Sequence, residues 1–390
     1  MVKKHAEDIL EEREEEISSF LQEIKEVKEI RSNRGRSYSL SEIFLLVLCA
    51  QLCGFESLRE YEMYGEMKLP LLRKFLPYKK GYPSKSTIAR VLSLFKPKCI
   101  EIVLMKWMER IVSSHQGQKQ IAIDGKRHRG AQTSEEEGLH LVSAYGVESG
   151  LVLAQEKVAN KSNEITAIPE LLDVLHIKGQ IVTIDAMGCQ KEIAKKIIDQ
   201  KADYILALKG NQGQLHEDIA LYFNHAPHLK KCAQYEAFDK GHGRFETRRC
   251  YVTDQINWLD NKEQWVGLKS IVAVESVCIT KGQETRETRF FISSLPPDPK
   301  LSLRSVRAHW GIEAMHWCLD VIFREDDRVI WNRNFAQNES IIRRLALNFL
   351  KKFQEICHYR IGNAKVALKT LRKILIGSDS DMEKLIMATF

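Results

Sequence analysis

The order of strand-like and helix-like stretches between residues 118 and 212 most constrains what this chain can fold into. From about residue 118 apolar side chains recur every second position, the period of a half-buried strand, and later stretches alternate this period with that of a helix. The predicted elements, in chain order, are strands at 120–124, 139–147 and 151–158, a helix at 164–175, a strand at 180–185, a helix at 190–200 and a strand at 204–208.

Three strands, helix, strand, helix, strand is the order of an RNase H-like core, in which the first and fourth strands lie side by side. We therefore predict an α/β fold whose mixed five-stranded RNase H-like sheet has flanking helices. Asp124 and Asp185 each end one of those two strands. Because adjacent parallel strands would bring these carboxylates to the same edge of the sheet, we expect them within reach of a shared metal ion.

A third candidate acid lies in the stretch SVRAHWGIEAMHWCLDVIFREDD, residues 305–327. As one helix, this stretch places four side chains on one face at i, i+3, i+4 and i+7, namely Glu313, His316, Trp317 and Asp320. In the alternative interpretation the helix is only amphipathic, with Ile312, Trp317 and Val321 in the core and its acids in solvent. The presence of Glu313 near the rings of His316 and Trp317, together with the two aspartates at the strand ends, favours a metal site.

The domain boundaries follow from the changes in sequence rhythm. We predict a helical N-terminal module for DNA binding or dimerisation at 1–112, the first part of the catalytic core at 118–212, a β-rich insertion at 213–300, the second part of the core at 301–365 and a C-terminal tail at 366–390. Two hairpins, with turns at 240–244 and 281–282, are expected in the insertion.

The N-terminal module contains several candidate DNA contacts. Ser39 and Glu42 form a capping-box pattern at the start of an apolar helix. Before it, a basic turn with Arg34 and Arg36 is either a mobile arm along phosphates or a solvated loop. After it, a helix carrying Lys85 and Arg90 is either the recognition helix of a helix-turn-helix or part of a packing module.

Composition narrows the cellular context. No apolar run reaches the roughly 18 residues of a membrane helix, and the charged N-terminus lacks a signal-peptide core, so we expect an intracellular protein. The nine cysteines form no CxxC pair, which favours buried free thiols over disulfides or a zinc site. The formal net charge is +7, and because the first thirty residues carry −5, the rest carries +12. That basic body favours a polyanionic partner, although excess charge also serves solubility.

Three carboxylates on rigid elements suit hard cations such as Mg²⁺ or Mn²⁺. In a two-metal site the ions activate the attacking oxygen and stabilise the leaving one during phosphodiester displacement. We expect Asp124 to bridge two ions, with Asp185 on one and Glu313 on the other. Neighbouring bases would hold phosphates beside them, namely Lys126, Arg127, Arg129 and Lys209.

At this point the chain resembles a known family. The blocks that carry the resemblance are IAIDGKRHRGA, HLVSAY, KSNEITAIPELL, VTIDAMGCQKEIA, DYILALKGNQ, GHGRFETRR, HWGIEAMHWCLDVIFREDD and RRLALNFLKK. They are similar to successive blocks of DDE transposases of the H-repeat-associated kind, encoded by bacterial insertion sequences. The resemblance covers roughly residues 18 to 355 and extends to the helical module.

The resemblance implies Mg²⁺-dependent (or Mn²⁺-dependent) DNA cleavage at transposon ends and strand transfer into target DNA. It places the catalytic triad on Asp124, Asp185 and Glu313. The implied DNA contacts are Lys209, Asn211, His242, Arg244, His309, Trp310 and His316. A DNA contact is also implied for Trp317, with core packing as the alternative. The implied partners are double-stranded DNA, comprising terminal inverted repeats and target, and further copies of the chain in a homodimer or larger assembly.

Two departures from the wider family pattern bear on the site. Where related transposases carry a tyrosine, arginine, glutamate and lysine, the same spacing here gives Val306, His309, Glu313 and Asp320. The acid in place of lysine leaves Asp320 as an outer-shell or substitute carboxylate. In the helical module Lys85-Ser86 replaces a His-Asp pair, which favours DNA contact or packing there. The alternatives to an active transposase are a domesticated DNA-binding protein and a metal-dependent nuclease that cuts without joining.

Overall fold

The computed structural model describes residues 29, 31–32, 36–102, 105–106, 119–128, 138–159, 162–241, 243–328, 330, 332–356, 360–361 and 364–387. Nearly all of the predicted N-terminal helix, residues 33–35 of the basic turn including Arg34, and the candidate DNA contacts Arg129 and His242 lie outside these residues. No helix in the described part of the chain is long and apolar enough to cross a membrane.

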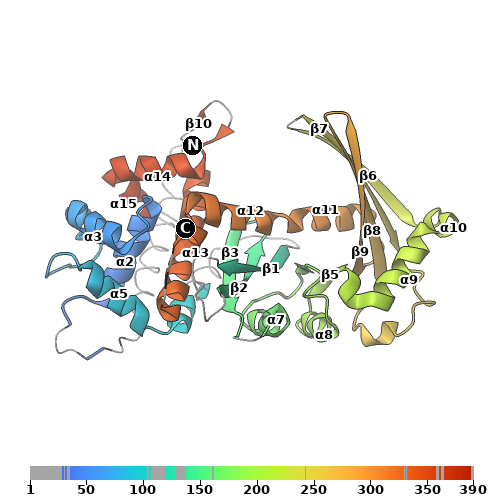
Figure 1. The fold of residues 1–390 in the computed structure, drawn as a ribbon, viewed down its shortest axis with the longest axis horizontal. Helices are drawn as coiled ribbons and strands as arrows, with labels where there is room; N and C mark the ends of the chain where they lie inside the picture. The colour runs from blue at the N-terminus through green and yellow to red at the C-terminus, as the bar shows by residue number, and fades with distance from the viewer. Residues whose placement is uncertain are drawn as a thin grey trace, which may run out of the picture.

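The central sheet has the predicted RNase H-like order, which confirms the fold class (Figure 1). Its first five strands are β1 (Gln120–His128), β2 (Leu139–Gly146), β3 (Leu151–Lys157), β4 (Ile181–Ile184) and β5 (Asp203–Leu208). The spatial order is β3-β2-β1-β4-β5, with β1 and β4 parallel neighbours. One boundary was wrong. β1 does not end at Asp124, because its residues as far as His128 stay paired with β2.

The β-rich insertion extends this sheet instead of forming a separate one. Its strands are β6 (Ala233–Gly241), β7 (Arg244–Thr253), β8 (Ser270–Thr280) and β9 (Gln283–Ser293), and both predicted hairpins are present. Because β9 pairs antiparallel with β5, the nine strands form one continuous sheet. The insertion also contains α9 (Gly213–Asn224) and α10 (Ala226–Leu229), helices that the sequence had not indicated. Its hairpins project from the core as an arm (Figure 1).

Helices cover both faces of the core. In Figure 1, α7 (Glu164–Asp173) and α8 (Lys191–Asp199) lie on one face, and α11 (Pro299–His309) and α12 (Gly311–Trp317) lie on the other. The predicted single helix over 305–327 is wrong. The helix is interrupted at Trp310, between α11 and α12. After α12 the chain forms a π-helical turn (Cys318–Ile322) and a 3₁₀ turn (Glu325–Asp327).

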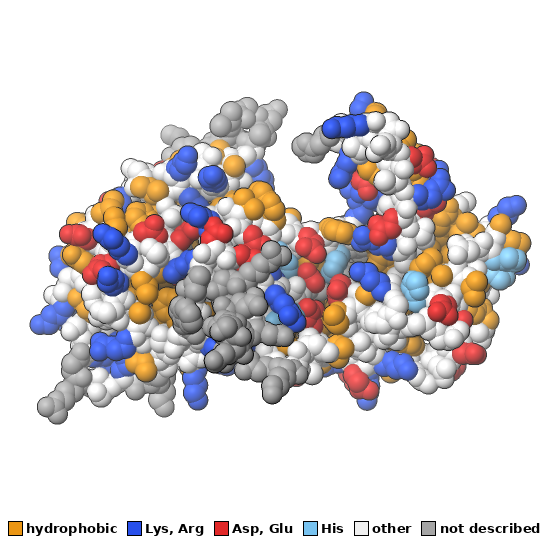
Figure 2. Space-filling model, in the orientation of Figure 1, with side chains coloured by type: hydrophobic (Ala, Val, Ile, Leu, Met, Phe, Trp, Pro, Cys, Tyr) orange, Lys and Arg blue, Asp and Glu red, His pale blue; other side chains and the backbone are white. Residues whose placement is uncertain are grey.

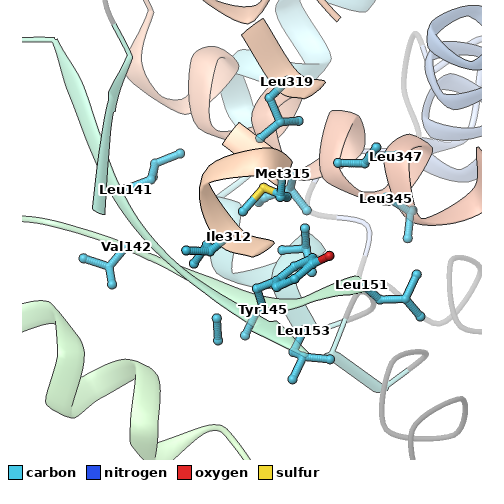
Figure 3. Close-up of a cluster of buried hydrophobic side chains, with 14 of the residues drawn as sticks. Leu141, Val142, Tyr145, Leu151, Leu153, Ile312, Met315, Leu319, Leu345 and Leu347 are labelled. Atoms are coloured by element: carbon cyan, nitrogen blue, oxygen red, sulfur yellow. The ribbon is translucent and has the colours of Figure 1, made fainter. Parts of the chain in front are cut away.

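A glycine explains how close α12 comes to the sheet. A Cβ at Gly311 would lie 3.0 Å from the ring of Tyr145 on β2, so a larger residue would push the helix away. Figure 3 shows Ile312 and Met315 beside Tyr145, with Leu319 further from the ring, and all three aliphatic side chains are fully buried. This packing fixes the rotation of α12 about its axis, which decides where its polar residues point.

The N-terminal helices pack around the long helix α13 (Arg333–Ile356) near the other end of the molecule. They are α2 (Leu40–Leu52), α3 (Leu58–Met67), α4 (Leu69–Leu72) and α5 (Lys85–Leu94). α2 begins with the predicted capping box, in which Ser39 and Glu42 satisfy each other's backbone N–H groups, and it is buried along its whole length. α13 contacts both α2 and α5, so the module is anchored to the core.

The segment predicted as a C-terminal tail, residues 366–390, contains two helices, and a short two-stranded hairpin lies just before it, at the end of the predicted second part of the core. β10 (Arg360–Ile361) and β11 (Ala364–Lys365) precede α14 (Leu368–Gly377) and α15 (Asp379–Met387). Lys68 pairs with Asp379 at 2.5 Å, and Arg372 donates to the Gln51 carbonyl at 2.8 Å. The last helices therefore complete the N-terminal helical module, as the neighbouring blue and red ribbons of Figure 1 show.

A buried ion network ties the long helix α13 to the turn that follows α12. Glu325, fully buried, lies 2.9 Å from Arg344 and 3.3 Å from Arg343. Although burial acts to raise it, the pKa of Glu325 stays well below its usual range, chiefly because of the charge of Arg344. Because each buried charge has an opposite partner, losing one would leave the others uncompensated.

Candidate active site

Asp124 and Asp185 stand at equivalent positions on neighbouring strands. Ile123 is the last residue of β1 with a partner on β4, and that partner is Ile184. Both aspartates follow these paired residues directly. They line one cavity of about 310 Å³, to which Glu313 also contributes. The sequence had brought these three acids together as a triad, and they face a common space.

The loop after β4 holds the Asp185 carboxylate in place. Its Oδ1 accepts the backbone N–H of Met187 at 3.1 Å. Asn211, predicted as a DNA contact, donates from Nδ2 to the carbonyl of Ala186 at 2.6 Å, which ties the loop to the chain after β5. Lys209, two residues earlier, is exposed and lines the same cavity, and its charge acts to lower the pKa of Asp185.

Glu313 and His316 reach the site from α12. The burial of Ile312 and Met315 against the sheet turns Glu313 toward the cavity, where its side chain is exposed. His316 is buried, and its Nδ1 lies 3.5 Å from Oδ2 of Asp124. Trp317 is 57% exposed, so the alternative interpretation, in which it packs in the core, is wrong.

The acids form two groups that could each hold a metal ion. One contains Asp124, Asp185 and Glu164, and the other contains Asp124, Glu313 and His316. In each group the candidate ligand atoms lie within 4.8 Å of one another. Asp124 belongs to both, which is the arrangement expected of a bridging carboxylate.

Electrostatics shows that these residues suit a cation. Burial, followed by the charges of Asp185 and Glu313, raises the pKa of Asp124 from 3.8 to about 8. Burial and the charge of Glu164 also raise the pKa of Asp185. Such mutual repulsion is relieved when a divalent ion sits between the carboxylates. The residues present therefore fit the oxygen-rich donor set that Mg²⁺ and Mn²⁺ prefer.

Two histidines of the site are held neutral. Burial lowers the pKa of His309 to about 4, and its Nδ1 lies 3.0 Å from the hydroxyl of Thr183. Burial and then the charge of Arg344 lower the pKa of His316 to about 3. At neutral pH neither ring carries the positive charge needed to pair with a phosphate, although each still offers a hydrogen bond or a lone pair.

The residue that sequence reasoning missed is Glu164. It is the first residue of α7, after the N-cap Asn163, so its sequence context indicated only a helix start. The strand order does not predict that Glu164 lies near the aspartates. Its position depends on the path of the chain from β3 into α7, which decides where that helix begins. In the structure it belongs to the same group as Asp124 and Asp185.

Lys126 and Asp320 form an internal ion pair beside the site. Lys126 Nζ lies 2.5 Å from Asp320, 3.1 Å from Glu325 and 3.3 Å from Asp326, and its side chain is 9% exposed. Lys126, predicted as a phosphate contact, thus already has three carboxylate partners. Asp320, whose role the sequence left open, pairs with this lysine.

A second cavity, of about 440 Å³, continues from the acids along the hairpin arm. Four of its lining residues are arginines, namely Arg244, Arg248, Arg289 and Arg307, against the two glutamates Glu246 and Glu287. Trp310, half exposed, lines both cavities, and the guanidinium of Arg289 lies 4.8 Å from its ring centroid. Figure 2 shows the notch between the arm and the helical body, with acidic and histidine side chains gathered below it.

The remaining predicted DNA contacts lie in the helical module. Lys85 and Arg90 are exposed on α5, at a distance from the acids along the long axis of Figure 1. Arg36 lies 3.9 Å from the carboxylate of Glu29. The structure therefore groups Lys209, Arg244, His309, Trp310 and His316 around the cleft, and it leaves Arg36, Lys85 and Arg90 outside it.

An RNase H-like sheet with carboxylates converging beside β1 and β4 defines a class of enzymes that act on phosphodiester bonds. Comparison with known proteins narrows this class. A family model described as "Transposase DDE domain" matches residues 115–349, and a model described as "DDE_Tnp_1-associated" matches residues 21–108. The chain belongs to the DDE transposase family, with relatives of the H-repeat-associated kind.

Two relatives span nearly the whole chain. "Putative transposase YncI" of Escherichia coli O157:H7 is 38% identical over 368 residues, which are 91% of this chain and 93% of the relative. "H repeat-associated putative transposase YhhI" of Escherichia coli (strain K12) is 36% identical over 381 residues, 93% of this chain and 99% of the relative. A solved piggyBac transposase synaptic complex with hairpin DNA matches 95% of this chain and 78% of its own, at 10% identity and a TM-score of 0.39, too low to support any argument.

Proposed function

We propose that this protein is an active DNA transposase of a bacterial insertion sequence, which binds terminal inverted repeats, cuts them and joins the freed ends to target DNA. The observation that carries the proposal is the placement of Asp124 in both carboxylate groups, with Asp185 on one side and Glu313 on the other. The proposed place of action is the nucleoid of the bacterial cytoplasm.

The three carboxylates would hold two Mg²⁺ or Mn²⁺ ions. Ions bound there would activate the attacking oxygen and stabilise the leaving oxygen of a phosphodiester. The chain's own contribution is positional. The parallel pairing of β1 with β4 fixes two of the acids, and the packing of α12 on Tyr145 fixes the third. Asn211 restrains the loop of Asp185, which limits the freedom of that carboxylate.

The cleft supports DNA as the substrate. A strand entering the site would pass Lys209 beside the acids and then the arginines of the arm, where positive charge exceeds negative charge. Trp310, at the junction of the two cavities, offers an exposed ring on which a base can stack. His309 and His316 would contribute hydrogen bonds or ligand atoms as neutral rings. Lys85 and Arg90 on α5 would contact DNA further along.

A strand-transfer assay tests the proposal. Purified protein, Mg²⁺, and DNA carrying the terminal repeats that flank its gene should yield nicked ends and then joined products. Asp185→Asn should abolish both products while leaving DNA binding intact. Asp199→Asn, an exposed aspartate on α8, is the matched control and should behave as wild type.

Each alternative gives a different result in the same assay. Cutting without joining would favour a metal-dependent nuclease. Binding that is indifferent to metal and to Asp185→Asn, with no products, would favour a domesticated DNA-binding protein. Size-exclusion chromatography with light scattering, with and without DNA ends, tests the proposed homodimer or larger assembly.

A further inference from the structure

Each of the two candidate ion positions contains one residue beyond the predicted triad. Glu164 accompanies Asp124 and Asp185, and His316 accompanies Asp124 and Glu313. Neither residue follows from the triad, and the two offer different donor atoms, a carboxylate oxygen and an imidazole nitrogen. This difference makes the two positions chemically distinct.

The Glu164 carboxylate is held in place and is not a freely moving surface group. Nε2 of His140 on β2 donates to it at 2.8 Å, and both side chains are about 85% buried, with exposed fractions of 15% for His140 and 13% for Glu164. A hydrogen bond of this kind commonly orients a carboxylate that binds metal. The first turn of α7 and a strand of the sheet thus fix the acid from two sides.

Gly125, immediately after Asp124, provides the space for this carboxylate. A Cβ at position 125 would lie 2.2 Å from Oε1 of Glu164, closer than real contacts allow. Any other residue would therefore move the acid away from Asp124. The β1 backbone is built so that a carboxylate from α7 can lie against it.

His316 is buried beside the carboxylates with one ring nitrogen close to Asp124 and the other unpaired among the described residues. It is 7% exposed, its Nδ1 lies 3.5 Å from Asp124, and its Nε2 has no hydrogen-bond partner in the described part of the protein. Burying an imidazole without satisfying it costs free energy. An ion bound between Nδ1 of this ring and the carboxylates of Asp124 and Glu313 would account for the position of the ring.

We propose that the two ion positions are unequal, with Glu164 completing an all-oxygen position around Asp185 and His316 supplying a nitrogen ligand to the position around Glu313. The inference rests on the proposed function and deepens it. The all-oxygen position suits Mg²⁺, whereas a mixed nitrogen and oxygen position favours Mn²⁺ over Mg²⁺. His140 acts as a positioning residue for Glu164.

A titration of the full-length protein with MnCl₂ tests the role of Glu164. The electron paramagnetic resonance signal of free Mn²⁺ measures how much of the ion is bound. Wild type should bind two ions, and Glu164→Gln should weaken one of them by about tenfold or more. Gly125→Ala should have a similar effect, because it displaces the carboxylate while keeping its charge. Glu170→Gln, an exposed glutamate on the same helix, is the control and should leave both ions unchanged.

Electron spin echo spectroscopy of the same samples tests His316. Bound Mn²⁺ should show coupling to a ¹⁴N nucleus that becomes ¹⁵N coupling when histidine is ¹⁵N-labelled. The coupling should vanish in His316→Gln and persist in His176→Gln, an exposed control. If His316→Gln does not fold, the labelled wild-type spectrum decides, because absence of nitrogen coupling there rejects the nitrogen ligand.

The outcomes separate this inference from the proposed function. The inference would be overturned if Asp185→Asn or Asp124→Asn loses bound Mn²⁺ while Glu164→Gln binds it as wild type does, and the wild-type spectrum shows no nitrogen coupling. That combination would leave the metal-dependent transposase intact. Failure of wild type to bind Mn²⁺, with no cleavage of the terminal repeats, would overturn both.

Discussion

The raised pKa of Asp124 makes stability depend on pH in a way that bound metal should cancel. The metal-free folded protein binds the Asp124 proton more tightly than the unfolded chain does, with a pKa of about 8 against 3.8. The free energy of unfolding from this group is therefore fully present below pH 3.8 and is lost as pH rises toward 8. The loss reaches at most about 5–6 kcal/mol above pH 8, and about 3–4 kcal/mol of it falls between pH 5 and pH 8.

Asp124→Asn removes this loss, so the variant should become increasingly more stable than wild type as pH rises. Thermal unfolding in EDTA, from pH 5 to pH 8.5, measures the difference in Tm between the two proteins. In wild type, a saturating concentration of Mg²⁺ or Mn²⁺ should raise Tm more at pH 8 than at pH 6, because the ion replaces the proton on Asp124. Asp199→Asn should show no such trend.

A difference in Tm that is the same at every pH would refute the reasoning. So would metal stabilisation that falls as pH rises, or that persists undiminished in Asp124→Asn. The first of these three outcomes would mean that Asp124 holds no proton at neutral pH, and each of the other two that it does not exchange a proton for a cation.

Three further predictions concern other parts of the molecule. Glu325→Gln should lower stability by about 3–5 kcal/mol in thermal or urea unfolding, because it removes the carboxylate that pairs with the buried Arg344. Asp327→Asn, in an exposed ion pair, is the control and should have little effect. Trp310→Ala should weaken binding of DNA ends by about 1–3 kcal/mol, or roughly 5- to 150-fold, in fluorescence anisotropy; unchanged affinity would contradict a stacking role. Asn211→Ala should slow cleavage by about 10–100-fold in single-turnover assays with little change in DNA affinity; a pure loss of affinity would show that Asn211 contacts DNA directly.

Much of the core could be predicted because local sequence determines it. Strand period and turn positions indicated the order of β1 to β5, and that order places Asp124 beside Asp185 through backbone pairing alone. The capping box at Ser39 and the hairpins of the insertion are likewise local features. Glu313 was assigned from its block of sequence, and its approach to the same cavity agrees with that assignment.

The rest depended on contacts between distant segments. The break at Trp310 and the rotation of α12 follow from the fit of Gly311 against Tyr145, which helical spacing alone does not reveal. The approach of Glu164 depends on the missing side chain of Gly125, 39 residues earlier. Lys126 looked like a phosphate contact in a basic run, but the turn after α12 brings three acids to it.

Anomalous diffraction at the manganese absorption edge, from crystals soaked in MnCl₂, tests the metal centre directly. The account predicts a peak in contact with the carboxylates of Asp124 and Asp185, and a second in contact with Asp124 and Glu313. Manganese bound elsewhere, or a Glu313 side chain turned away from both aspartates with Mn²⁺ present, would contradict it.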